Sequence, residues 1–139
     1  MGMLKKILAP TDFSDLSAHG VRYACRLARD MGAELIIFNV LVLDESNRVD
    51  KRELEQHKKR LGEFVTEKIA DGAVGLKMLQ MVDAGQPFGA IVDCAGKEAV
   101  DLIVMSSHGR TGLSRMLIGS VTDKILRGAP CPVLVVPSK

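Results

Sequence analysis

Glycines and polar side chains are concentrated in one stretch near the C-terminus, residues 105–120, which reads MSSHGRTGLSRMLIGS. The stretch follows an apolar run and leads into a segment with helical spacing, so we expect it to end at a helix N-terminus. Backbone N–H groups and the positive end of the helix dipole favour a phosphate at such a place. Glycines let the backbone approach that phosphate, Ser120 adds a hydroxyl, and Arg110 and Arg115 add charge. The stretch predicts a phosphate-binding loop; the alternative is a loop whose glycines only turn the chain.

A second group of polar residues follows the first apolar run of the chain. Thr11, Asp12 and Ser14 come soon after that run, which ends at Pro10. An acidic residue near a strand end commonly forms hydrogen bonds with a ribose or an amide, which makes Asp12 a candidate ligand contact. Asp and Ser are also common helix-capping residues, and the spacing alone does not decide between the two roles.

The histidines and cysteines give weaker indications. His108 lies in the glycine-containing stretch and is either a base or phosphate contact or a solvent-facing loop residue. His19 and His57 fall on expected helices and look incidental. The three cysteines lack the spacing of a zinc site, which favours small buried apolar groups. The sequence has no GxxxxGK[ST] motif and no GxGxxG motif after its first strand, which argues against two large classes of nucleotide-binding protein.

Length and charge limit the possibilities further. The chain has 139 residues and a net charge of +2. This length is typical of one domain, so residues 1–139 are expected to form a single domain. The small net charge argues against nucleic acid or an anionic membrane as partner. No apolar run approaches the roughly 18 residues of a membrane-spanning helix, and the odd number of cysteines fits a reducing cytoplasm.

Apolar runs alternate with amphipathic stretches along the whole chain. The runs predict strands at 4–10, 34–42, 76–82, 102–105 and 132–136. Helices are expected from Ser14 to Gly32, from 51 to 70, from Pro87 onward and from Ser120 onward. The mixed charges of 51–60 are typical of a solvated helix face. This alternation predicts an α/β fold with an open five-stranded parallel sheet and helices on both faces.

Four segments of the sequence resemble the universal stress protein family, in its small single-domain form. They are KKILAPTDFS at 5–14, DLIVMSSHGRTG at 101–112, GSV at 119–121 and PCPVLVVP at 130–137. The resemblance implies a Rossmann-like sheet of the adenine nucleotide alpha-hydrolase type, with strand order 3-2-1-4-5. It also implies a homodimer formed through the last strand, at Val133, Leu134, Val135 and Val136.

The ATP-binding branch of this family carries the motif G-x2-G-x9-G-[S/T]. Gly109, Gly119 and Ser120 match it, and Ser106 stands in place of the first glycine. The resemblance implies a bound ATP, with Mg²⁺ or Mn²⁺ held mainly by the phosphates. It places the base and ribose at the first loop and at Val40, and the phosphates at the glycine-containing loop. The expected nucleotide-binding residues are Pro10, Thr11, Asp12, Val40, Met105, Ser106, His108, Gly109, Arg110, Gly119, Ser120 and Val121.

The leading hypothesis is an ATP-binding stress-response protein that acts as a nucleotide-regulated dimer. One alternative is a dimeric interaction module without nucleotide. Another is a slow ATP hydrolase, for which the sequence offers no assignable base or water-positioning residue.

Overall fold

The computed structural model describes residues 4–107 and 118–137, and within them strands and helices alternate along the chain. The strands are β1 (Lys6–Pro10), β2 (Glu34–Val42), β3 (Met78–Gly85), β4 (Leu102–Ser106) and β5 (Val133–Val136). The α-helices are α1 (Asp15–Met31), α2 (Lys51–Phe64), α3 (Pro87–Lys97) and α4 (Ser120–Gly128). Neighbouring strands are parallel, and the sheet order is β3-β2-β1-β4-β5. The expected α/β fold and strand order are confirmed.

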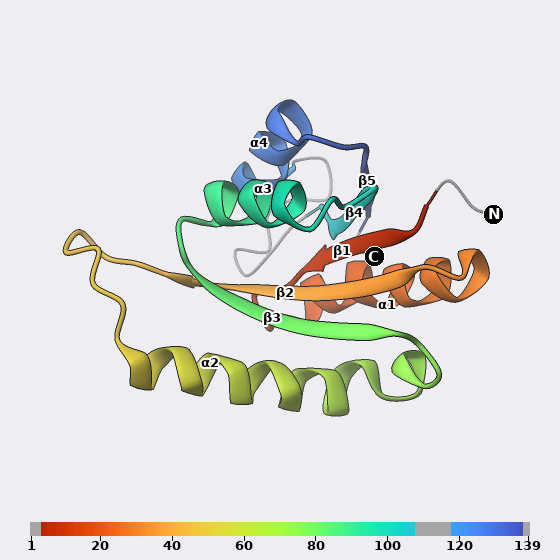
Figure 1. The fold of residues 1–139 in the computed structure, drawn as a ribbon, viewed down its shortest axis with the longest axis horizontal. Coiled ribbons are helices and arrows are strands. Elements are labelled where there is room, and N and C mark those ends of the chain that lie inside the picture. The colour runs from red at the N-terminus through yellow and green to blue at the C-terminus, as the bar shows by residue number, and fades with distance from the viewer. Residues whose placement is uncertain (1–3, 108–117, 138–139) are drawn as a thin grey trace.

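The sheet lies between two layers of helices, with α1 and α2 on one face and α3 and α4 on the other (Figure 1). Strand β2 runs through the interior of this arrangement. Its residues Leu35 and Ile37 face the α1 layer, and Ile36 and Phe38 face the α3 layer, all with no exposed surface. Burial on both faces explains why the strand is an almost continuous apolar run.

Local signals fix both ends of α1. The Ser14 side chain accepts a hydrogen bond from the Ser17 amide, which satisfies one of the N–H groups that have no partner within the helix. At the other end Gly32 adopts φ 65°, a left-handed conformation that suits glycine, and its N–H donates to Ala28 O. The expected start and end of this helix are confirmed.

The segment after α2 departs from the single helix expected over 51–70. The α-helix ends at Phe64, and a π-helical turn (Val65–Ile69) and a 3-10 turn (Ala70–Ala73) follow. The wider π turn places Phe64 and Ile69, which are five residues apart, both in the core. On the α1 side, Arg22 Nε donates to Lys68 O at 3.0 Å, and Arg29 Nη2 donates to the Gly72 and Val74 carbonyls. The apolar stripe of this segment, formed by Leu54, Leu61, Phe64, Val65 and Ile69, packs in the core, but its spacing is not purely α-helical.

Smaller differences concern element ends and one side chain. β3 covers Met78–Gly85 instead of 76–82, because its parallel pairing with β2 continues as far as Val42 opposite Gly85. β1 begins at Lys6 and β5 at Val133, each later than expected. Met31 continues the helical spacing of the buried residues Val21, Ala24 and Ala28 in α1, yet it is 39% exposed.

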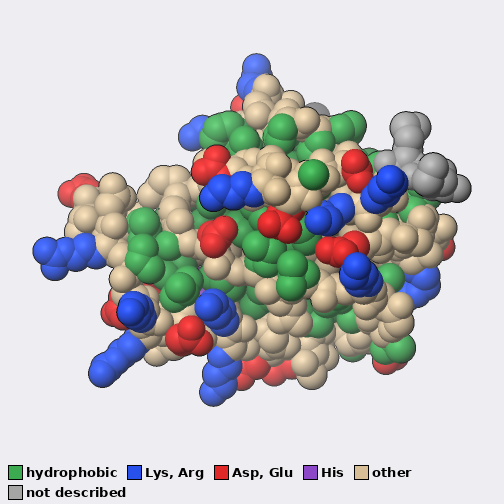
Figure 2. Space-filling model, viewed as in Figure 1, with side chains coloured by type: hydrophobic (Ala, Val, Ile, Leu, Met, Phe, Trp, Pro, Cys, Tyr) green, Lys and Arg blue, Asp and Glu red, His purple; other side chains and the backbone are tan. Residues whose placement is uncertain are grey.

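Charged side chains of both signs are interspersed over the face of the molecule shown in Figure 2, including the region along α2. This agrees with the expectation that the charged run at 51–60 is a solvated helix face. Within residues 4–107 and 118–137, no helix combines the length and the apolar character needed to cross a membrane.

Helix α1 approaches strand β4 very closely at Gly20. A Cβ atom at this position would lie 2.7 Å from the Ser106 backbone nitrogen and 2.9 Å from the Met105 carbonyl carbon. Both are strand backbone atoms, so they cannot move without disturbing the sheet. The absence of a side chain at Gly20 therefore sets the distance between α1 and β4.

Gly20→Ala is expected to lower the free energy of unfolding by about 1–3 kcal/mol, the usual cost of overpacking a buried contact. Gly89→Ala, in α3, is the matched control, because a Cβ there would meet nothing within 4 Å. The control should raise stability by up to about 1 kcal/mol, since alanine is the better helix former. Urea denaturation of the two variants measures both effects. A free energy of unfolding of Gly20→Ala equal to that of the unmodified protein would contradict the tight contact at Gly20.

Candidate functional site

A cavity of about 590 Å³ opens at the carboxyl ends of β1, β2 and β4. The chain order of the strands reverses here, because β1 leads through α1 to β2 on one side and has β4 on its other side. In open parallel sheets, ligands bind in the crevice at such a point. The volume lies within the range of small-molecule sites, roughly 300–1,000 Å³.

The cavity gathers every expected site residue within the part of the chain that the structure describes. The first loop and the strand ends contribute Pro10, Thr11, Asp12, Val40, Met105 and Ser106, and the start of α4 contributes Gly119, Ser120 and Val121. The other three expected residues, His108, Gly109 and Arg110, lie outside the described residues. Two segments about a hundred residues apart in sequence therefore form one site.

The N-terminus of α4 lies at the wall of this cavity. Gly119 is the N-cap, and the first hydrogen bond of the helix runs from the Asp123 amide to Gly119 O at 2.9 Å. The amides of Ser120, Val121 and Thr122 precede that bond, so they have no acceptor within the helix. Together with the helix dipole they form a place that favours an anion.

Two hydrogen bonds fasten this helix start to the end of β4. The Gly119 amide donates to Ser107 O at 2.8 Å, and Thr122 Oγ1 donates to Ser106 O at 3.1 Å. The Thr122 side chain is buried. The strand thus holds the helix N-terminus at the wall of the cavity.

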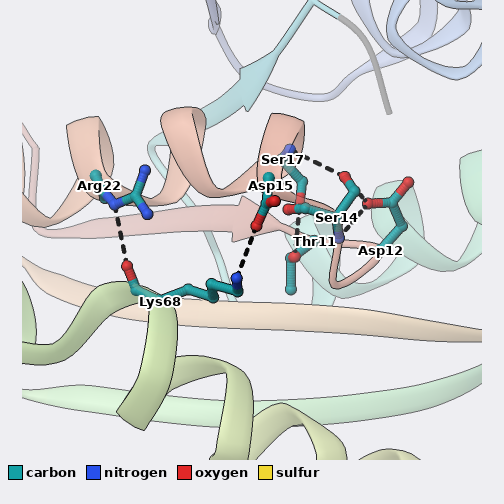
Figure 3. A network of polar contacts seen from close by, with 7 residues as sticks. All are labelled: Thr11, Asp12, Ser14, Asp15, Ser17, Arg22 and Lys68. Atoms are coloured by element: carbon teal, nitrogen blue, oxygen red, sulfur yellow. Dashed lines mark hydrogen bonds and ion pairs between the residues drawn. The ribbon is translucent and has the colours of Figure 1, made fainter. Parts of the chain in front are cut away.

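The loop after β1 is held by a short chain of polar contacts (Figure 3). Thr11 and Ser17 share a hydroxyl–hydroxyl hydrogen bond of 2.7 Å. Asp12 Oδ1 accepts hydrogen bonds from both the amide and the hydroxyl of Ser14, and Ser14 Oγ in turn accepts from the Ser17 amide. Asp12 therefore braces the start of α1 and also lines the cavity.

A charged contact lies just outside this loop on α1. Lys68 Nζ is 2.9 Å from Asp15 Oδ1, and the hydrogen bond and charge of Lys68 hold the pKa of Asp15 below its usual range (Figure 3). Both side chains are well exposed, so the pair adds little to stability. Its effect is to keep the π-helical turn close to the first turn of α1.

The Ser106 side chain, which stands where the motif has glycine, is buried against α1. Its hydroxyl donates to Leu16 O at 2.7 Å and accepts from the Gly20 amide at 2.9 Å. These two backbone groups are four residues apart in the helix, so the hydroxyl is inserted between an ordinary helical donor and acceptor. The hydroxyl thus fastens a helix to the strand.

The polar cavity residues on β2 and α2 were not among the expected site residues: they are Asn39, Glu53, His57 and Arg60. His57 was considered incidental, yet its Nδ1 lies 2.8 Å from Asn39 Oδ1. Glu53, His57 and Arg60 are spaced by four and three residues, which places them on one face of α2. That spacing, beside the apolar stripe that faces the sheet, is the signal from which the polar wall could have been inferred.

The buried thiols are not suited to nucleophilic chemistry. Burial raises the pKa of Cys25 and of Cys94 to about 11, so both are protonated at neutral pH. This agrees with the expectation of small buried groups. Among residues 4–107 and 118–137, no group of three or more His, Cys, Asp or Glu is arranged to hold a metal ion.

The fold and this site identify the class of protein. Residues 3–137 match the universal stress protein family, and the chain belongs to it. Universal stress protein MJ0531 of Methanocaldococcus jannaschii is 35% identical over 142 residues, covering 96% of this chain and 82% of the relative.

Solved structures agree with this assignment. The structure of MJ0577 superposes with a TM-score of 0.68 at 32% identity, covering 99% of this chain and 98% of the other. A universal stress protein in complex with cAMP superposes with a TM-score of 0.73 at 25% identity, covering 98% of each chain.

Ser106→Ala is expected to lower the free energy of unfolding by about 1 kcal/mol, the net value of an ordinary hydrogen bond, because Leu16 O and the Gly20 amide can still pair with each other. Affinity for ATP, the ligand that the motif predicts, should change by less than about tenfold. Urea denaturation and calorimetric titration measure the two quantities. Ser46→Ala, in an exposed loop, is the control, and it should change neither.

A large loss of ATP affinity in Ser106→Ala, with an unchanged free energy of unfolding, would contradict this expectation. The hydroxyl would then be a ligand contact instead of a fastening for α1. Ser106→Gly extends the test, since it removes the Cβ as well and restores the glycine of the motif. It should not weaken binding beyond the same limit.

Proposed function

We propose that this chain binds an adenine nucleotide, ATP in particular, in the cavity at the carboxyl ends of β1 and β4, and that the nucleotide acts as a regulatory ligand. One observation carries the proposal. The described residues of the two segments expected to hold base, ribose and phosphate line a single cavity, and the N-terminus of α4 lies at its wall.

In this proposal, each part of the nucleotide lies against residues that suit its chemistry. The amides of Ser120, Val121 and Thr122 and the Ser120 hydroxyl take the phosphates. Asp12 takes the ribose, because an ionised carboxylate accepts hydrogen bonds from the sugar hydroxyls. The adenine ring packs on the apolar side of the cavity, which includes Val40 and Met105.

A divalent cation, Mg²⁺ or Mn²⁺, is held through the phosphates, where it neutralises part of their charge. The protein side of the site supplies backbone amides and hydroxyls, and these groups fit a phosphate–cation unit better than a bare cation. The cAMP complex of the relative at 25% identity supports the adenine nucleotide class. We propose in addition a cytoplasmic role in the response to stress, which membership of the family supports.

Absorbance gives a rapid test of the proposal. The chain has no tryptophan and a single tyrosine, so even a small amount of copurified adenine nucleotide dominates the ratio of absorbance at 260 and 280 nm. Calorimetric titration of the stripped protein with ATP, AMP and cAMP then ranks the ligands. No binding of any of the three would favour an interaction module without nucleotide.

Gly119→Val is expected to abolish ATP binding and to leave the fold intact. Gly119 has φ −61° and ψ 153°, a conformation that valine adopts readily. The hydrogen bond from its backbone N–H to Ser107 O does not need a glycine. The only change is the added side chain at the cavity wall. Titration measures the loss of binding, and circular dichroism checks the fold.

Gly96→Val is the control of equal size, because a Cβ at Gly96 would meet nothing within 4 Å and the residue does not line the cavity. Gly119→Ala should have an intermediate effect. Unchanged ATP affinity in Gly119→Val would contradict the phosphate position proposed here.

We also propose a homodimer formed by pairing β5 with its copy across a two-fold axis. β5 is an edge strand, and its residues Val133, Leu134, Val135 and Val136 are each partly exposed. The strand carries no charge, and Pro132 and Pro137 limit its length on either side. Such an edge favours pairing with another chain.

Val135→Lys is expected to convert the dimer into a monomer, because it places a charge in the middle of the paired strand. Sedimentation velocity at micromolar concentration should give twice the chain mass for the unmodified protein and a smaller species for the variant. Leu126→Lys, on an exposed position of α4, is the control. A monomeric unmodified protein would contradict the proposal.

A further inference from the structure

Phe13, in the loop between β1 and α1, has a backbone conformation that bulky residues rarely adopt. Its φ of 72° lies in the left-handed region, where the Cβ atom is crowded by the neighbouring backbone. In this conformation the Phe13 amide donates to Thr11 Oγ1 at 3.0 Å, which closes a tight turn of the chain. Such a conformation persists only where the surrounding structure holds it.

Three side chains of α2 hold the Phe13 ring. Its centroid lies 5.7 Å from that of His57 and 6.2 Å from that of Phe64, within the range of aromatic pairs, roughly 4.5–7 Å. The Arg60 guanidinium lies 4.6 Å from the centre of the ring, a cation–π contact. The three residues follow one another at intervals of three and four, so one face of the helix supplies them all. Packing from α2 therefore stabilises the unusual backbone of Phe13.

The loop is anchored on either side of Asp12 and Phe13. Before them, Thr11 is held by β2, since Asn39 Nδ2 donates to Thr11 O at 2.9 Å. After them, Ser14 caps α1. The two residues span the gap between these anchors, so the backbone of Phe13 sets the direction in which the chain crosses it.

The Phe13 side chain lies outside the cavity in which we propose that the nucleotide binds. Pro10, Thr11 and Asp12 line that cavity, whereas Phe13 and Phe64 line a separate, smaller cavity of about 230 Å³. The ring therefore reaches the nucleotide cavity through the backbone of the loop. Any effect of the ring on nucleotide binding is indirect.

We propose that Phe13 is a positioning residue through which helix α2 controls the affinity of the site for its nucleotide. The inference rests on the proposed function and extends it to the control of the same site. While α2 packs on the ring, the loop keeps the conformation in which Thr11 and Asp12 line the cavity. When that packing is lost, affinity falls with the fraction of unbound protein that still has this loop conformation. By linkage, the bound nucleotide in turn strengthens the docking of α2.

The competing explanation is that the Phe13 ring only adds to the apolar core. Phe13→Ala and Phe13→Gly separate the two explanations, because both remove the ring but only the alanine variant keeps a Cβ. Alanine disfavours a φ of 72°, whereas glycine adopts it readily. A core role predicts that both folded variants bind ATP with the dissociation constant of the unmodified protein. A positioning role predicts weaker binding in the alanine variant and partial rescue in the glycine variant.

The experiment is calorimetric titration of the whole chain with ATP, under conditions where circular dichroism shows each variant to be folded. Phe13→Ala should weaken ATP binding about tenfold, in keeping with the usual cost of a left-handed backbone. Phe13→Gly should bind ATP about threefold more tightly than Phe13→Ala. Phe88→Ala, on α3, is the control, since Phe88 packs against the core and does not line the nucleotide cavity. It should lower the free energy of unfolding and leave ATP affinity unchanged.

Phe64→Leu tests the same connection from the side of the helix. Phe64 is buried and does not line the nucleotide cavity, and leucine keeps the position apolar. The variant should weaken ATP binding, by less than Phe13→Ala does. Unchanged ATP affinity in Phe13→Ala or in Phe64→Leu would overturn the inference, and so would equal affinities of Phe13→Ala and Phe13→Gly. These results leave the proposed function standing, whereas failure of ATP to bind the unmodified protein would overturn the proposed function and the inference together.

Discussion

The contact between α1 and β4 is the interaction on which the rest of the site depends. It depends on the missing side chain of Gly20, and the Ser106 hydroxyl adds hydrogen bonds to the helix backbone at Leu16 and Gly20. The same helix begins at the loop that carries Asp12, and the same strand ends where α4 is fastened. One tight packing contact therefore sets the distance between the two halves of the cavity.

The cavity has an apolar side and a polar side, and these correspond to the two faces of the sheet. On the α3 side it is apolar, because Phe38 and Ile91 belong to the core beneath α3 and α4. On the α2 side, Asn39 and His57 give it polar walls. A nucleotide has the same division between a flat ring and a polar sugar, and the alternation of side chains along β2 provides both kinds of surface from one strand.

Much of the fold could be predicted because its signals are local. The Ser14 cap, the left-handed Gly32 and the apolar run of β2 are all determined by neighbouring residues in the sequence. The polar wall could not be predicted in this way. Asn39 and His57 are 18 residues apart, and only the packing of α2 on the sheet brings them together. The direction of the Ser106 side chain was missed for the same reason, since the motif gives its position along the chain and not the helix it faces.

The hydrogen bond from the Gly119 amide to Ser107 O has a consequence for how this site can change over evolution. It joins the end of β4 directly to the start of α4, so the strand and the helix are held together by a contact outside the segment of chain that connects them. The entropy of loop closure grows only slowly with length, by about 0.6 kcal/mol for each doubling. Insertions and deletions between these two residues are therefore inexpensive. A lineage can therefore alter the length of this connection while the sheet beneath is inherited unchanged.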